Sequence, residues 1–257
     1  MLTAIRKGKL SSEQENMEDI LTSSVFGAFQ YSESSDALIR FLKESKRVCG
    51  DIPIPENIDD FQVDFDGYEF WPFWGGLKGV DNCEPDLVIR IQNPEGRDLL
   101  VAIEAKFHSG KSAFSSSDGN ISDQLAKQWV HLFKRAQGQS CIPWLIYLTA
   151  DTTSPTNEIL ESRDELASKL RFSDEVNQLR ISWLSWRELV DLFKCSDKQQ
   201  LSELSSLATY LGLAYYKGMG RFDQLPECHY QFCQDSRRFK WNFKQVSNSS
   251  WRFDNDQ

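Results

Sequence analysis

Apolar residues in the middle of the chain form two short continuous runs separated by a polar segment. The runs cover residues 87–91 and 99–103, and the segment between them contains Asn93, Pro94, Gly96 and Asp98. Continuous apolar runs of this length are typical of buried strands, and Asn, Pro, Gly and Asp are typical of tight reversals. The sequence therefore predicts two adjacent strands joined by a turn.

Other segments of the chain predict helices and strands around this pair. The segments with apolar residues at helical spacing are 12–30, 121–133, 154–170, 186–193 and 201–216. The further strand segments are 61–65, 68–74, 144–150 and 180–184. The run at 144–150 is continuously apolar, as in buried parallel strands. Because strands and helices alternate, we expect an α/β fold, a mixed central sheet flanked by helices on both faces.

Length and composition set the expected organisation. With 257 residues, of which 40% are apolar, the chain can bury one full core. We expect a core domain over 1–199 and an accessory portion over 200–257, with a soft boundary. No run has transmembrane length and no signal-peptide pattern is present, so we expect no membrane association. The six cysteines lack paired spacing, which favours reduced thiols and a cytoplasmic protein.

Charged residues stand where the paired strands begin and end. Asp86 precedes the first strand, and Glu104 and Lys106 follow the apolar run of the second. Adjacent strands would bring Asp86 and Glu104 to one edge, and alternation would put Glu104 and Lys106 on one face with Ala105 on the other. Burying such charges is costly unless they pair or hold a cation. The pattern predicts a metal site; a plain ion-pair network in a different α/β enzyme is the alternative.

The segment Pro85-Asp86 together with Glu104-Ala105-Lys106 resembles the motif of the PD-(D/E)xK nuclease superfamily. The resemblance implies a restriction-endonuclease-like core in which Asp86 and Glu104 bind Mg²⁺, for which Mn²⁺ would substitute. It also implies that Ala105 contributes its main-chain carbonyl and that Lys106 positions the attacking water. Magnesium prefers carboxylate oxygens and keeps several waters, which is consistent with this ligand set.

Two further residues enter through the same resemblance. Members of the superfamily often place a glutamate from an N-terminal helix beside the metal, and here Glu18 is preferred to Glu15 because core-facing residues flank it. The alternative for Glu18 is a solvated acidic turn that complements the helix dipole. Gln124 resembles the glutamine of a fourth motif in RecB-like members, although Trp129 follows it at five residues instead of a tyrosine at four. An exposed helix glutamine is the alternative for Gln124.

The net charge of −9 is unusual for a freestanding DNA-binding protein, because such proteins generally carry a basic face. The basic candidates are Lys111, in a polar loop after the Glu104 strand, and Arg238 and Lys240, in a tail where basic and aromatic residues alternate. A strand there would suit stacking on bases and pairing with phosphates. A plain edge strand is the alternative. A partner protein that grips the nucleic acid would also account for the acidity.

Taken together, the resemblance implies a metal-dependent endodeoxyribonuclease that hydrolyses DNA phosphodiester bonds. As a small, acidic chain, it resembles those superfamily members that act in prokaryotic restriction and antiviral defence systems. Restriction-type nucleases often act as homodimers. The alternative function is a non-catalytic interaction or nucleic-acid-binding subunit that keeps the nuclease fold.

Overall fold

The fold is taken from a computed structural model, which describes residues 13–32, 35–53, 61–107, 120–194, 196 and 198–214. The chain divides into two compact units, Met1–Ala214 and Tyr215–Gln257. All residues of the second unit lie outside the described ranges. The architecture below is therefore that of the first unit.

An open sheet with six strands in the described part of the chain forms the centre of this unit, in the order β1-β6-β5-β4-β3-β2. The strands are β1 (Lys46–Cys49), β2 (Tyr68–Phe70), β3 (Leu87–Ile91), β4 (Leu99–Ala105), β5 (Ile142–Thr149) and β6 (Ile181–Ser185). β4, β5 and β6 run parallel to one another, whereas β1–β6, β2–β3 and β3–β4 are antiparallel. The predicted α/β fold with a mixed central sheet is confirmed.

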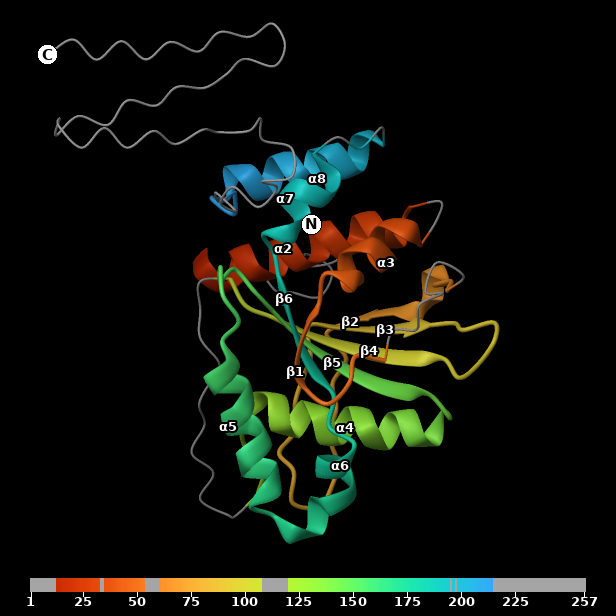
Figure 1. Cartoon of the computed structure of the whole chain (residues 1–257), viewed down its shortest axis with the longest axis vertical. Coiled ribbons are helices and arrows are strands. Elements are labelled where there is room, and N and C mark those ends of the chain that lie inside the picture. Colours follow the sequence, from red (N-terminus) through yellow and green to blue (C-terminus); the bar gives the residue numbers. More distant parts are fainter. Residues whose placement is uncertain are drawn as a thin grey trace, which may run out of the picture. The chain divides into compact units, whose positions relative to one another are not determined.

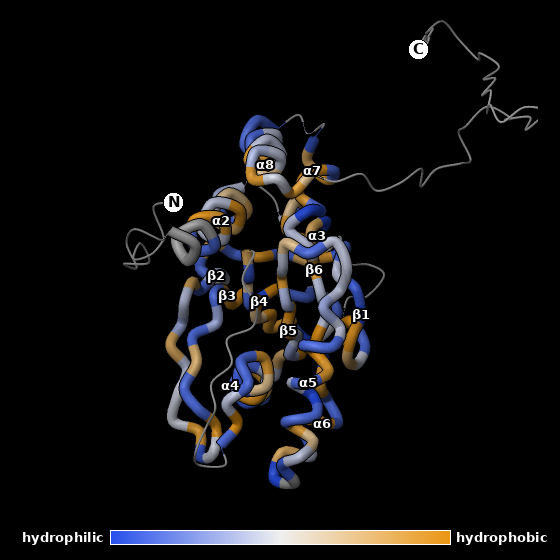
Figure 2. Tube along the Cα trace, turned by 90° about the vertical axis from the view of Figure 1, so that its left-hand side faces the viewer, coloured by the Kyte–Doolittle hydropathy of each residue, from blue (hydrophilic) through white to orange (hydrophobic). Residues whose placement is uncertain are grey.

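Helices cover both faces of the sheet, as Figure 1 shows. The helices are α2 (Glu13–Gln30), α3 (Asp36–Lys43), α4 (Gln124–Gly138), α5 (Thr156–Ala167), α6 (Ser173–Asn177), α7 (Glu188–Phe193) and α8 (Gln199–Tyr210), with single 3₁₀ turns at Phe65–Gly67 and Leu170–Phe172. α2 and α3 lie on one face, and α4 and α5 lie on the other (Figure 1). In Figure 2 the central strands β4 and β5 lie between α2 and α4.

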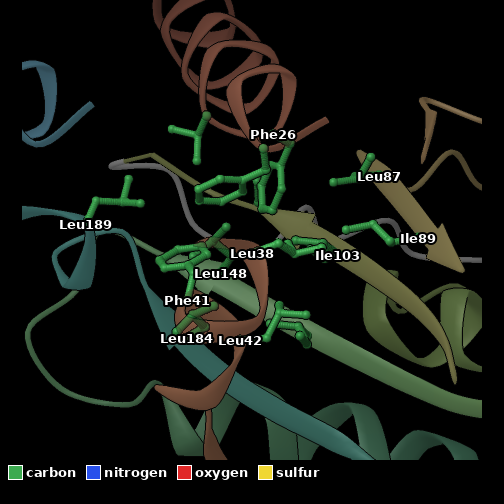
Figure 3. Close-up of a cluster of buried hydrophobic side chains, with 14 of the residues drawn as sticks. Phe26, Leu38, Phe41, Leu42, Leu87, Ile89, Ile103, Leu148, Leu184 and Leu189 are labelled. Carbon is green, nitrogen blue, oxygen red and sulfur yellow. The ribbon is translucent and has the colours of Figure 1, made fainter. Parts of the chain in front are cut away.

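The core on the α2 face is rich in aromatic side chains. Phe26 is fully buried, and its ring lies 5.8 Å from Phe29, 6.2 Å from Phe41 and 6.0 Å from Trp186. Figure 3 shows Phe26 and Phe41 in the same cluster as strand residues such as Ile103 and Leu148. Because these rings come from α2, α3 and the start of α7, their packing joins three segments to one face of the sheet.

The core on the α4 face uses the alternate residues of the same strands. Val88 and Ala102 face this side and pack with Trp129 and Phe133 of α4. The indole Nε1 of Trp129 donates to the carbonyl of Glu175 at 2.8 Å, so the large buried ring also has its polar atom satisfied. Every residue of β4 is buried, as expected for a central strand covered on both faces.

Several predicted elements appear almost where the apolar pattern puts them. β3 has the predicted bounds, and β4 runs two residues further than predicted because Glu104 and Ala105 still pair with β5. The helices predicted at 12–30 and 186–193 correspond to α2 and α7. The helix predicted over 201–216 is shorter: it ends at Tyr210, and Gly212 follows with a φ of +73°, a backbone conformation that glycine adopts easily.

The strand predicted at 61–65 does not form in the described residues. Gln62 makes only an isolated bridge with Gln92, and Phe65 begins a 3₁₀ turn. The strand predicted over 68–74 stops at Phe70, because Trp71 has a φ of +47°, which no strand accommodates. β2 is therefore a three-residue edge strand.

The pattern also gave no indication of α3 or β1. α3 has only eight residues, and β1 is an edge strand whose first two side chains are exposed. α8, assigned from the sequence to the accessory portion, packs on α7 and α2 in the first unit. None of the described helices is long and apolar enough to cross a bilayer. Among the described cysteines, Cys49, Cys83 and Cys141 are buried free thiols.

Replacing Phe26 by alanine tests the aromatic cluster. The substitution should lower the free energy of unfolding by about 3–5 kcal/mol, because it leaves a cavity among rings that cannot collapse together. Chemical denaturation measures the change. Tyr210→Ala is the matched control: Tyr210 is 87% exposed, so its truncation should change stability by less than about 0.5 kcal/mol. Equal effects of the two substitutions would contradict the packing described here.

Candidate functional site

The acidic residues lie where β3 begins and β4 ends. β3 and β4 are antiparallel with Leu87 opposite Ile103, so the next pair along the two strands is Asp86 and Glu104. A direct hydrogen bond fixes this end of the pair: the amide of Ala105 donates to Asp86 Oδ2 at 2.7 Å. The predicted juxtaposition of the two acidic residues at one sheet edge is confirmed. Both are buried, with exposed fractions of 8% for Asp86 and 2% for Glu104.

The two faces of β4 separate the charged residues from the apolar one, as alternation predicts. Ala105 is buried in the core cluster on the α2 face. Glu104 points to the other face, where side chains of α4 contact it. Lys106, the residue after β4, also reaches Glu104: its Nζ lies 2.6 Å from Glu104 Oε1. Glu104 and Lys106 therefore form a buried ion pair at the strand end.

Glu18 approaches the same lysine from α2. Its Oε1 lies 3.2 Å from Lys106 Nζ, and its Oε2 accepts a hydrogen bond from the amide of Phe107 at 2.8 Å. Both carboxylate oxygens thus bind the backbone and side chain just beyond β4. The structure brings Glu18 to the cluster, whereas the side chain of Glu15 lies outside the described residues.

Two glutamines of α4 hold Glu104 from the other side. Gln124 Nε2 donates to Glu104 Oε1, and Gln128 Nε2 donates to Glu104 Oε2. With Lys106, three N–H groups contact the two oxygens of one carboxylate. Gln124 is therefore not the exposed glutamine of the alternative interpretation, because its side chain contacts the acidic cluster.

The start of α4 is fixed by carboxylates that satisfy its first amides. The side chain of Asp123 accepts from the amide of Ala126 at 3.0 Å, as an N-cap residue does. Glu165 of α5 accepts from the amides of Ser122 and Asp123 at 3.0 and 2.9 Å. These bonds place the first turn of α4, and hence Gln124, against the end of β4.

Among the described residues, three carboxylates share this cluster with one ammonium group, that of Lys106. Burial, and then the charge of Glu104, raise the pKa of Asp86 well above its ordinary value, although Lys106 and the Ala105 amide oppose the rise. Burial alone would lower the pKa of Lys106. The charges of Glu104, Asp86 and Glu18 outweigh that effect and raise it, so the lysine stays protonated. The described residues of the cluster thus include more carboxylates than ammonium groups, and the ionised form of Asp86 is disfavoured there.

A hydrogen-bond count shows which oxygens are engaged. Within the described part of the chain, Asp86 accepts at Oδ2 and no donor contacts its Oδ1. The side chain of Gln128 also has an unused acceptor: its Oε1 is buried and has no donor among the described residues. Leaving such an acceptor unsatisfied costs about 1–3 kcal/mol.

The backbone next to Asp86 adopts an unusual conformation. Trp71 is a buried, bulky residue with a φ of +47°, which lies in the left-handed region that such residues rarely occupy. Its amide donates to the carbonyl of Asp86 at 3.0 Å. Strained residues of this kind persist where surrounding contacts enforce them, and they are frequent at functional sites. Here the hydrogen bond from the Trp71 amide holds the main chain of Asp86 in place.

Other predicted site residues do not belong to this cluster as described. Lys111, Arg238 and Lys240 lie outside the described residues. His131 is buried on α4 with its Nε2 3.2 Å from the carbonyl of Asp81. Burial lowers its pKa, which favours the neutral ring.

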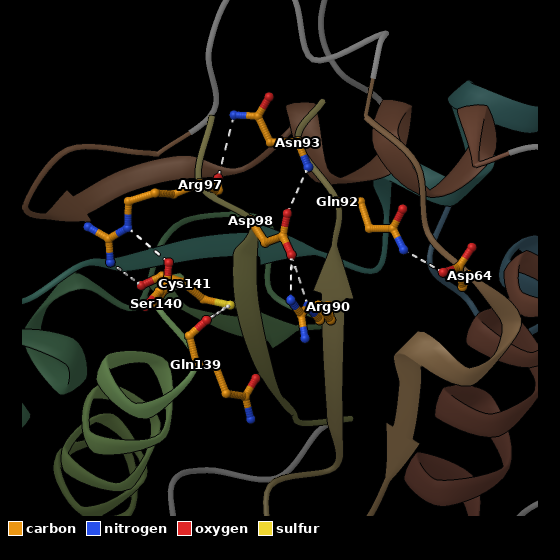
Figure 4. A network of polar contacts seen from close by, with 9 residues as sticks. All are labelled: Asp64, Arg90, Gln92, Asn93, Arg97, Asp98, Gln139, Ser140 and Cys141. Atoms are coloured by element: carbon orange, nitrogen blue, oxygen red, sulfur yellow. Dashed lines mark hydrogen bonds and ion pairs between the residues drawn. The ribbon is translucent and has the colours of Figure 1, made fainter. Parts of the chain in front are cut away.

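A polar pocket of about 330 Å³ lies at the opposite end of β3 from Asp86. It is lined by Gln62, Gln92, Asn93, Pro94 and Asp98. Figure 4 shows the bonds that organise this turn, including those from Arg90 to Asp98 and from Gln92 to Asp64. These residues close the β3–β4 turn, and none of them touches the acidic cluster.

The acidic cluster offers the donor atoms that a hard divalent cation prefers. Asp86, Glu104 and Glu18 supply carboxylate oxygens, and these suit magnesium and manganese better than soft metals. In the described residues, however, no group of three or more His, Cys, Asp or Glu side chains is already arranged around a metal position. The Nζ of Lys106 contacts both Glu104 and Glu18, so the residues match a cation by the type of their donor atoms and not by a preformed arrangement.

Comparison with known proteins gives no match: no family model, no curated protein and no solved structure matches this chain.

One residue of the cluster was not found from the sequence. Gln128 contacts Glu104 directly and is 1% exposed. The signal was its spacing: Gln128 stands four residues after Gln124, which places both on the same side of a helix. A polar residue in the middle of an otherwise apolar helix face is a candidate for a buried contact.

Replacing Asp86 by asparagine tests the excess negative charge. Because folding raises the pKa of Asp86, its ionised form costs stability, and that cost appears as pH rises through the raised pKa. The asparagine variant should therefore be more stable than the wild type in metal-free buffer at neutral pH, by on the order of 1 kcal/mol. The gain should vanish below the ordinary pKa of aspartate. Denaturant titrations across pH, with a chelator present, measure it.

The matched control is Asp98→Asn at the other end of the same strand pair. Asp98 forms an ion pair with Arg90 at 2.7 Å, and 22% of its side chain is exposed. Its neutralisation should lower stability slightly, by up to about 1 kcal/mol. If Asp86→Asn destabilised the protein at neutral pH, the charge excess would not exist as described.

Proposed function

We propose that this protein is a divalent-metal-dependent nuclease with a restriction-endonuclease-like core, which hydrolyses phosphodiester bonds in DNA. One observation carries the proposal: Glu104 and Glu18 pair with the ammonium of Lys106 at the buried end of two strands, where Asp86 accepts from the neighbouring Ala105 amide. In the part of the chain that the structure describes, these three carboxylates have one ammonium beside them, and folding alone gives no reason to gather these groups. A divalent cation would supply the missing charge.

In the proposed site, Asp86 and Glu104 hold the ion, together with the main-chain carbonyl of Ala105. Mn²⁺ is expected to replace Mg²⁺, because both accept carboxylate ligands. When bound, such an ion polarises the phosphoryl oxygen and lowers the pKa of a bound water. Glu18 assists from α2, and Gln124 keeps Glu104 in place.

Lys106 is the residue proposed to act on the substrate. Its ammonium is held protonated by the surrounding carboxylates, so it can donate to a phosphate oxygen and offset the charge that develops there. Water adds to phosphorus, the bond to one ester oxygen breaks, and that oxygen leaves with a proton. The products are a phosphomonoester and a free hydroxyl on the two fragments.

The acidity of the chain bears on how DNA is held. With a net charge of −9, the protein would gain little nonspecific affinity for phosphates. The proposal therefore includes a partner protein that brings the DNA, with Lys111, Arg238 and Lys240 as local contacts. A homodimer that cuts both strands, and a role in prokaryotic restriction or antiviral defence, rest on resemblance to the superfamily alone.

A second candidate is a non-catalytic subunit that keeps the nuclease fold. The observation that favours it is the pairing of Lys106 with both Glu104 and Glu18, which already satisfies the ammonium without a metal. Isothermal titration calorimetry with Mg²⁺ and Mn²⁺ separates the two candidates. Binding that is lost in Glu104→Gln supports the nuclease, whereas no binding by the wild type supports the non-catalytic subunit.

The test of activity compares Lys106→Ala and Asp86→Asn with the wild type in Mg²⁺ or Mn²⁺. Nicking of supercoiled plasmid and cleavage of labelled single-stranded and duplex oligonucleotides measure the rates. Each substitution should lower the rate by at least about 100-fold, because each removes a group that acts on the transition state or holds the ion. Lys134→Ala is the matched control. Lys134 lies on α4, away from Glu104, and pairs with Glu175 at 2.7 Å, so the loss of its side chain should leave the cleavage rate unchanged. Unchanged rates in both site variants would refute the assignment.

A further inference from the structure

Glu18 differs from the other two carboxylates of the cluster in its position. It is only partly buried, whereas Asp86 and Glu104 are buried. Both of its oxygens are bound at the end of β4: Oε1 lies 3.2 Å from Lys106 Nζ, and Oε2 accepts from the amide of Phe107 at 2.8 Å. An ammonium and a backbone N–H from two consecutive residues therefore hold one carboxylate near the surface.

These two donors suit a phosphate as well as a carboxylate. Both anions present neighbouring oxygens that accept charge-assisted hydrogen bonds, and lysine side chains and backbone N–H groups are common phosphate contacts. Although burial opposes it, the surrounding carboxylates raise the pKa of Lys106, so its ammonium stays a donor for either anion. Glu18 thus occupies a position in which two phosphate oxygens would meet the same donors.

Anchoring of α2 to the sheet does not account for the contact. Among the described side chains of α2, the buried ones begin at Leu21, about one turn after Glu18, and the ring of Phe26 packs against Phe41. This apolar face holds the helix without Glu18. Lys106 would also keep its contact with Glu104 at 2.6 Å if Glu18 moved away. The Glu18 contact can therefore be exchanged without leaving the lysine unpaired.

The charges of the cluster require an exchange and not an addition. A phosphodiester carries one negative charge, as the Glu18 carboxylate does, so replacing one by the other leaves the total charge beside Lys106 unchanged. A phosphate that entered while Glu18 stayed in place would add a further negative charge next to the carboxylates that already contact this lysine. Like charges at such short range repel each other. Binding of a phosphate therefore requires Glu18 to leave.

We propose that Lys106 Nζ and the Phe107 amide form a phosphate-binding site, and that Glu18 occupies this site as an internal competitor until a phosphodiester displaces it. The inference rests on the proposed function for the identity of the ligand, the phosphodiester of a nucleic acid, and not on a bound metal. It is compatible with the assisting role proposed for Glu18, because a displaced carboxylate is free to take a new partner.

The experiment measures binding of diethyl phosphate, a diester with one negative charge, in the presence of a chelator. NMR titration of the ¹⁵N-labelled full chain gives the dissociation constant and follows the amide resonance of Phe107. Glu18→Gln should bind the diester about 10-fold more tightly than the wild type, because the charged competitor is removed. Adding Lys106→Met to this variant should weaken binding again by about 10-fold or more, because the ammonium donor is lost.

Glu203→Gln is the matched control, because it removes the same charge at an exposed position of α8, where the carboxylate accepts from Gln199 at 2.8 Å. It should leave the dissociation constant as in the wild type. Glu18→Ala is a second variant, which removes the acceptor oxygens as well as the charge. It should bind the diester at least as tightly as Glu18→Gln, and circular dichroism melts verify that both variants fold.

The outcomes separate this inference from the function on which it rests. Tighter binding in both Glu18 variants that depends on Lys106 supports the inference. Equal or weaker binding in both, tighter binding that persists without Lys106, or no diester binding by any of the proteins overturns it. Failure of both variants to fold also overturns it, since Glu18 would then be a structural residue. The proposed nuclease has a different readout: absence of cleavage with Mg²⁺ or Mn²⁺ would refute it and leave the phosphate site intact.

Discussion

The buried carboxylate of Glu104 is the interaction on which the arrangement of this protein depends. It stands at the end of a strand that is covered on both faces, and a group in that position needs donors from several directions. Lys106 from its own strand and two glutamines from α4 supply them. Removing those contacts would leave an unpaired charge in the core. The ends of β4 and α4 are therefore tied together by one side chain.

This constraint connects the fold to the site. α4 must begin beside the end of β4, and the cap formed by Asp123 and the two bonds from Glu165 fix that start. On the opposite face, α2 must bring Glu18 to the same lysine, and the aromatic cluster around Phe26 holds α2 against the sheet. Helices on opposite faces thus meet at one strand end, α2 through Glu18 and α4 through two glutamines, while their apolar sides define the two halves of the core.

The central sheet and its acidic edge could be predicted from the sequence because both depend on short-range patterns. Continuous apolar runs gave β3 within its exact bounds, and alternation placed Glu104 and Ala105 on opposite faces. The segment around Trp71 was misread because its φ of +47° depends on contacts with Asp86 and not on local propensity. α3 and β1 were missed because an eight-residue helix and a partly exposed edge strand have weak patterns. Gln128 was missed because its partner is distant in sequence and only its spacing from Gln124 hinted at a shared face.

The same charged residues are compatible with two interpretations, an ion-pair network and the proposed metal site. With Lys106 between Glu104 and Glu18, its contacts are those of an ion-pair network, yet burial and the charge of Glu104 raise the pKa of Asp86 and disfavour its ionised form. A site made only for stability would lose that carboxylate, because an asparagine could still accept from the Ala105 amide. Retaining an ionisable group where its charge is costly is reasonable when a cation offsets the cost during function. The disfavoured charge of Asp86 is thus the physical argument that supports our proposal of a metal site at this strand end.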